Sequence, residues 1–101
     1  MRILMKVKLP HKAFNNAVKK GNAGKKMRAI LEEMKPEAVY FTEMEGCRTA
    51  IIVVDLEKPS MVPSLAEPWF LTFNADVGMH VVMSPEEVEE AGLDNLGERW
   101  A

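Results

Sequence analysis

Four segments of the chain have the spacing of hydrophobic and polar residues that is typical of β-strands. In the first of them, hydrophobic residues alternate with mostly basic ones until Pro10. The segments are residues 2–9, 37–43, 48–55 and 75–83. Residues 44–47 separate the second from the third and contain Gly46, which supplies the backbone freedom of a tight turn. The pattern therefore predicts four strands, the middle two joined as a hairpin.

The segments between these strands carry hydrophobic residues at helical spacing. Residues 11–20 form one such stretch, and residues 21–24 interrupt it. The stripe then resumes up to Pro36, which cannot continue a helix. Residues 59–73 form another helical stretch, in which Pro68 removes a backbone donor and predicts a kink or a restart.

A third helical region follows the last strand, because Ser84-Pro85-Glu86-Glu87 combines a capping serine, a proline at the first position and a glutamate three residues after the cap. The order strand, helix, strand, strand, helix, strand predicts an α+β fold. We expect one ferredoxin-like domain over residues 1–101, a βαββαβ sandwich with an antiparallel four-stranded sheet. Residues 1–83 form its core and residues 84–101 a C-terminal helical tail.

Residues 51–54 are hydrophobic on both faces of their strand, which is typical of an interior strand covered on both sides. Two helices from one small chain can cover only one face of the sheet. The sequence therefore predicts that a second copy covers the other face in a homodimer. We expect the acidic tail to pack on that partner or on the sheet edge.

The composition is that of a globular protein, with 48% hydrophobic and 28% charged residues and a net charge of −2. One cysteine excludes an internal disulfide, and no apolar run resembles a signal peptide or a membrane span, so we expect a cytoplasmic protein. Basic residues dominate 1–35 and acidic residues dominate 36–101. Because aromatic residues do not alternate with the lysines and the net charge is negative, we expect the two halves to attract one another and expect no nucleic-acid or membrane partner.

Several kinds of chemistry lack their motif. The glycine-rich segment 21–26 follows a helix and lacks the spacing of a phosphate loop. His11, His80 and Cys47 do not have the spacing of metal ligands, so we expect no metal and no cofactor. Cys47 lies beside Glu45, and a neighbouring carboxylate disfavours a reactive thiolate.

Polar and aromatic residues on hydrophobic elements are the candidates for a site. His80 titrates near neutrality and Tyr40 can orient an oxygen, so these two are the candidate acid–base groups. Arg48 can pair with Glu43 across the hairpin or hold a carboxylate. The predicted ligand-binding residues are Tyr40, Arg48, Trp69, Phe73 and His80. The kink at Pro68 is expected to lift the aromatic residues from the sheet and leave room for a ligand beneath them.

The order of elements over residues 1–83 resembles the dimeric α/β-barrel superfamily, whose small ferredoxin-like chains pack their sheets face to face. Residues 35–43 and 65–70 resemble a group of short bacterial proteins of unknown function. The resemblance implies a homodimer. It transfers no catalytic residues, because neither a His–Asp pairing nor an Asn-Trp-His set of that superfamily is matched.

These patterns favour a protein that binds a small apolar or aromatic molecule in an apolar cavity between sheet and helices. One alternative is a cofactor-independent monooxygenase- or isomerase-like enzyme. The other is a ligand-free structural or interaction module. Polar residues that converge on a cavity favour the enzyme, an apolar cavity favours binding, and a filled core favours the interaction module.

Overall fold

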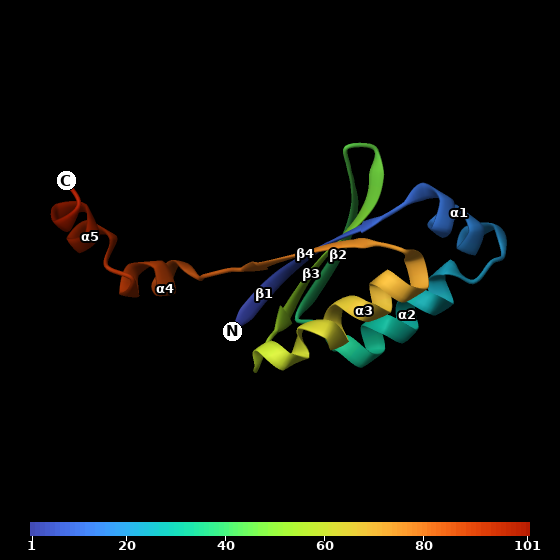
Figure 1. Ribbon diagram of the computed structural model, residues 1–101, viewed down its shortest axis with the longest axis horizontal. Coiled ribbons are helices and arrows are strands. Elements are labelled where there is room, and N and C mark those ends of the chain that lie inside the picture. The colour runs from blue at the N-terminus through green and yellow to red at the C-terminus, as the bar shows by residue number, and fades with distance from the viewer.

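The computed structural model describes residues 1–101 and contains one antiparallel sheet with the strand order β2-β3-β1-β4 (Figure 1). The strands are β1 (Arg2–Leu9), β2 (Ala38–Met44), β3 (Cys47–Asp55) and β4 (Asp76–Val81). All four predicted strands are present, within two residues of the predicted ends. The prediction that residues 51–54 belong to an interior strand is confirmed, because β3 lies between β2 and β1.

The register of the sheet assigns every residue to one of two faces. Met5 of β1 is opposite Ile52 of β3 and Met79 of β4, and these three side chains share one face. Lys6 is opposite Ile51 and Gly78, and these residues share the other face. Successive side chains of β1 therefore lie on opposite faces of the sheet.

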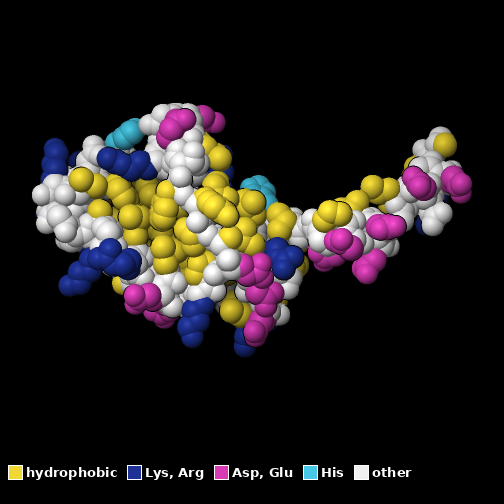
Figure 2. Space-filling model, turned by 180° about the vertical axis from the view of Figure 1, so that it is seen from behind, with side chains coloured by type: hydrophobic (Ala, Val, Ile, Leu, Met, Phe, Trp, Pro, Cys, Tyr) yellow, Lys and Arg dark blue, Asp and Glu magenta, His cyan; other side chains and the backbone are white.

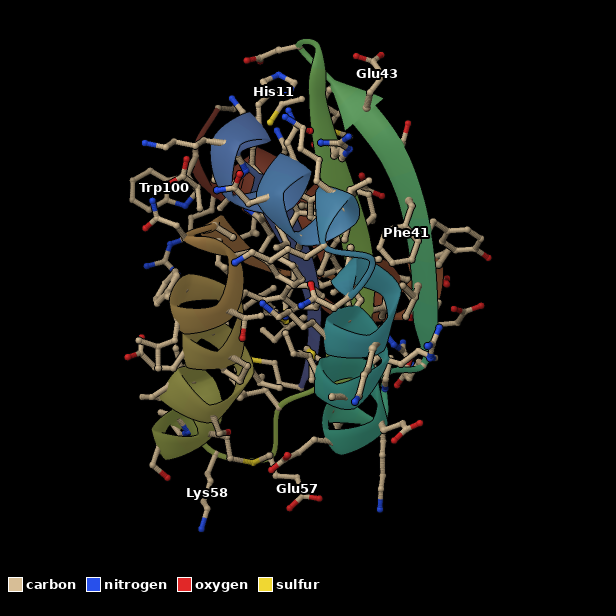
Figure 3. All side chains as sticks on the ribbon, turned by 90° about the vertical axis from the view of Figure 1, so that its right-hand side faces the viewer. His11, Phe41, Glu43, Glu57, Lys58 and Trp100 are labelled. Carbon is tan, nitrogen blue, oxygen red and sulfur yellow. The ribbon has the colours of Figure 1, made fainter.

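Three helices cover the face that carries Met5: α1 (His11–Lys19), α2 (Ala23–Met34) and α3 (Val62–Phe73). Figure 3 shows α2 and α3 side by side and α1 above them, in one layer in front of the sheet. The side chains of Trp69, Phe73, Met5 and Ile52 lie between the two layers and are fully buried. This arrangement is an α+β sandwich compatible with a ferredoxin-like fold.

The expected kink at Pro68 does not lift the second half of α3 from the sheet. The helix is continuous from Val62 to Phe73, and Trp69 and Phe73 are both 0% exposed. Proline removes the hydrogen bond to the carbonyl of Ser64, four residues earlier. Ser64 is exposed, so water can satisfy that carbonyl and the helix tolerates the proline without leaving the core.

The predicted hairpin is a two-residue turn. Met44 pairs with Cys47, and Glu45 and Gly46 between them have φ values of 55° and 76°. Two successive positive φ values are typical of a type I′ turn, whose twist matches that of the flanking strands. Of the two turn residues, Glu45 adopts a positive φ although it is not a glycine.

The chain beyond β4 leaves the sandwich. Helices α4 (Pro85–Glu90) and α5 (Leu93–Arg99) form an arm that points away from the sheet and the helix layer (Figure 1). A capping box at Ser84 and Glu87 fixes the start of α4, as its sequence predicts. No helix in the structure has the length and hydrophobicity needed to span a membrane.

Candidate functional site

Two of the five predicted ligand-binding residues belong to the core. The rings of Trp69 and Phe73 stack with centroids 6.1 Å apart, and Phe73 also contacts Phe14 of α1 at 5.2 Å. Both residues are fully buried against the sheet. They fill the space between sheet and helices that was expected to hold a ligand.

Two other predicted residues, Tyr40 and His80, lie on the uncovered face of the sheet. Tyr40 belongs to β2 and His80 to β4, which are the two edge strands. Three strand-to-strand spacings separate the edges, or roughly 14 Å at about 4.8 Å each. The two candidate acid–base groups of one chain therefore lie at opposite edges of the sheet.

Arg48 lies on the helix-covered face, at the hairpin end of β3. Its Nη1 atom donates a hydrogen bond of 2.7 Å to Oδ1 of Asn15, and its guanidinium lies 4.8 Å from the centre of the Phe14 ring. The predicted pair with Glu43 is not formed. Glu43 instead accepts a hydrogen bond from the backbone amide of Gly46, because the tight turn directs that amide toward it.

The uncovered face, here called the open face, carries a hydrophobic band across β1, β2 and β3. Its central residues are Leu4, Ile51 and Val53, which are half-buried by one another. Lys6 lies among them, and Tyr40 extends the band onto β2 with 69% of its surface exposed. Figure 2 shows how extensively hydrophobic side chains reach the surface of the sandwich, with lysines and arginines around them. No helix of this chain covers the open face.

The structure also brings together a set of polar residues that the sequence did not group. A shallow pocket near the β2–β3 hairpin is lined by Lys8, His11, Glu45, Cys47 and Asp76, together with Pro10. The signal for this grouping was the register, since Lys8 is the partner of Asp76 on one side and of Thr49 on the other. That register depends on pairing between β1 and β4, which are far apart in sequence.

The chemistry of this polar pocket is limited by the bonds its members already make. The Cys47 thiol is buried and donates a hydrogen bond of 3.1 Å to the carbonyl of Leu9. The Lys8 ammonium lies 3.7 Å from a carboxylate oxygen of Glu45. No group of three or more histidine, cysteine, aspartate or glutamate side chains is arranged to hold a metal ion.

Two hydrophobic clefts flank α3. The first, the α2–α3 cleft, has a volume of about 380 Å³ and is lined mainly by apolar residues of the two helices, with Glu33 at its wall. The second, the α3–β4 groove, has a volume of about 560 Å³ and lies along the free edge of β4. None of the five predicted ligand-binding residues lines either of them.

Comparison with known proteins gives no family assignment: no protein-family model matches the chain, and no curated protein is significantly similar to it.

Proposed function

We propose that this protein is a self-associating domain of the ferredoxin-like, dimeric α/β-barrel type, whose open sheet face packs against that of a second copy. The observation that carries the proposal is the hydrophobic band of Leu4, Ile51 and Val53, which no element of the chain covers. Burial of apolar surface contributes roughly 25 cal/mol per Å². A sheet with one open hydrophobic face gains this contribution when a matching face covers it.

Val53→Asp is the test of this assembly, because Val53 lies at the centre of the open face. An unpaired charge buried in a contact costs about 3–5 kcal/mol, so the dissociation constant of the dimer should rise at least about 100-fold. The measurement is the molar mass by light scattering over a concentration series. Val18→Asp is the matched control, since Val18 is 49% exposed on α1, away from the open face. A monomeric wild type at micromolar concentration, or equal effects of the two substitutions, contradicts the proposal.

A second candidate function is binding of a small molecule in the α2–α3 cleft. Its volume of about 380 Å³ lies within the roughly 300–1,000 Å³ typical of small-molecule sites. The hydroxyl of Ser64 in its wall already donates to the carbonyl of Met61. Glu33 is therefore the charged group left to orient a ligand, which favours an apolar or aromatic molecule that carries a cationic amine.

Thermal-shift measurements with small aromatic amines, and with carboxylates of the same shape, test this candidate. Binding raises the melting temperature by mass action, by an amount set by the ligand concentration and its affinity. The amines should shift the wild type and should shift Glu33→Gln less. Glu32→Gln is the control, since its neighbour Glu33 lines the cleft and Glu32 does not. No shift with any amine, or equal shifts for both variants, excludes this cleft as the site.

A further inference from the structure

The C-terminal arm, residues 82–101, gives the molecule an unusually extended shape. The longest dimension is 58 Å and the radius of gyration is 16.9 Å, whereas a compact domain of this length has about 13 Å. Figure 1 shows that the arm causes this extension, since the rest of the chain forms a short sandwich. A folded segment held away from its own core lacks the packing that normally stabilises a short helix.

Helix α5 presents an unpartnered hydrophobic stripe. Leu93, Leu96 and Trp100 are 59%, 43% and 77% exposed. Leu93 and Leu96 share one side of the helix, and Trp100 is the C-cap residue that follows Leu96 by four positions. Single exposed hydrophobic residues are ordinary, but a tryptophan and two leucines aligned on a short acidic helix are typical of a docking surface. A hydrophobic groove is the kind of surface that such a stripe fits.

The α3–β4 groove has the matching chemistry. Its lining residues are Val62, Pro63, Ala66, Phe70, Val77, Met79 and the single carboxylate Glu67. Phe70 is 40% exposed, although the neighbouring Trp69 on the same helix is fully buried. The groove is thus a second hydrophobic surface without a partner, located on the strand from which the arm departs.

Charge favours contact between the arm of one molecule and the sandwich of another. Residues 84–101 carry six carboxylates and one arginine, a balance of −5, and the remaining residues have a balance of +3 within the total of −2. Figure 2 shows the acidic and hydrophobic side chains together on the arm. Opposite net charges increase the rate of encounter and fix the orientation of a hydrophobic contact.

The direction of the arm indicates which molecule it contacts. The arm leaves β4 on the side of the open face, opposite the helix layer (Figure 1). Only residues 82–84 connect β4 to α4, and the capping box at Ser84 and Glu87 begins the new helix at once. In the proposed homodimer, the second copy occupies that side. We infer that each arm packs against the second copy, so that Leu93, Leu96 and Trp100 bind in the partner's α3–β4 groove. This inference rests on the proposed homodimer.

Site-directed crosslinking between two differently tagged chains tests the inference. Both chains carry Cys47→Ser, which removes the native thiol and keeps a donor for the carbonyl of Leu9. One chain adds Phe70→Cys in the groove, and the other adds Leu96→Cys on the stripe. A short thiol-specific crosslinker should join the two chains to each other. Leu71→Cys replaces Phe70→Cys in the control, because Leu71 is the next residue of α3, is 81% exposed and does not line the groove.

The inference is supported if the cysteines at positions 70 and 96 of different chains crosslink at several times the yield of the cysteines at positions 71 and 96. Equal yields, or no product, overturn it. A chain that carries both Phe70→Cys and Leu96→Cys should give a covalent dimer with itself. A product in which the two cysteines of one chain are joined, with no dimer, shows that the arm folds back on its own groove and also overturns it.

The double substitution Leu96→Ser with Trp100→Ser provides an independent measurement. It should raise the dissociation constant of the dimer by about 10- to 100-fold, since buried tryptophan and leucine contacts dominate such interfaces. Glu89→Gln with Glu90→Gln, on the same arm, should change it much less. A wild type that is dimeric but unaffected by the double substitution contradicts the arm contact alone. A wild type that is monomeric contradicts both the arm contact and the homodimer.

Discussion

The two faces of the sheet differ far more in burial than in the type of residue that forms them. Ile51 and Ile52 are neighbours on β3 with identical side chains, yet Ile52 is 0% exposed beneath the helix layer and Ile51 is part of the open face. On the covered face, Phe14 of α1 and Trp69 and Phe73 of α3 pack against the sheet within the buried core. On the open face, the same kind of hydrophobic surface has no cover. The difference shows that burial in this chain depends on the helix layer rather than on hydrophobicity.

Alanine substitution at Ile51 and Ile52 should give the largest measurable difference between the two faces. Ile52→Ala should lower the free energy of unfolding by about 2–5 kcal/mol, because it leaves a cavity in a filled core. Ile51→Ala should cost less than about 1.5 kcal/mol at protein concentrations where the chain is monomeric. Denaturant unfolding at low and high protein concentration measures both. A cost at Ile51 that equals the cost at Ile52 even in the monomer would show that the arm covers the open face within one chain.

The second prediction concerns Arg48, a polar residue at the end of the core on the covered face. Arg48→Met removes the hydrogen bond to Asn15 and the contact of the charge with the Phe14 ring. The expected loss is about 1–2 kcal/mol. A double-mutant cycle with Asn15→Ala should give a coupling energy of about 0.5–1.5 kcal/mol. A coupling near zero would mean that the bond does not contribute to stability.

The third prediction concerns Lys6, a charged residue within the hydrophobic band of the open face. Lys6→Leu should change the stability of the monomer by less than about 0.5 kcal/mol, as surface substitutions usually do. It should lower the dissociation constant of the dimer, since a hydrophobic side chain replaces a charge in the contact. Sedimentation equilibrium measures the constant. A weaker dimer would indicate that the Lys6 ammonium has a partner across the interface.

The smallest expected effect concerns the arm. Hydrogen bonds from the backbone and then the side chain of Ser84 lower the pKa of Glu87 from its ordinary value of 4.5. Because the folded-state pKa is depressed, the cap stabilises α4 above pH 4.5 and this contribution is lost as the pH falls through the lowered pKa. The Ser84 amide resonance should therefore shift only below pH 4.5, and Glu87→Gln should abolish the shift. A midpoint above 4.5 would contradict the capping box.

The spacing of hydrophobic residues was sufficient to predict the strands, the hairpin and the capping box, because each depends on residues close in sequence. It did not predict how Pro68 is accommodated, since that depends on the exposure of Ser64 in the finished fold. The grouping of Lys8, His11 and Asp76 was also missed. Their proximity follows from the pairing of β1 with β4, which no local pattern records.

The positions of the candidate site residues in the fold were harder to predict than the strands, for the same reason. Periodicity correctly put Tyr40 and His80 on strands, but which face they share, and which edges they occupy, follows from strand order. Trp69 and Phe73 have the spacing of a helical stripe, which is the same for a ligand wall and for a core. Only the filled space beneath them distinguishes the two.

The central position of β1 has a consequence for how the chain folds. This first strand pairs with β3 and β4, so neither of its neighbours is available until residues 47–55 and 76–81 have been synthesised. During synthesis, Ile3, Met5 and Val7 have no partner strand until β3 has been made, and they lack the second one until β4 has been made. Such long-range pairing slows folding, and unpaired strands are prone to aggregate. Lys6 and Lys8, which interrupt this strand, give it the positive charge that keeps an unpaired strand in solution.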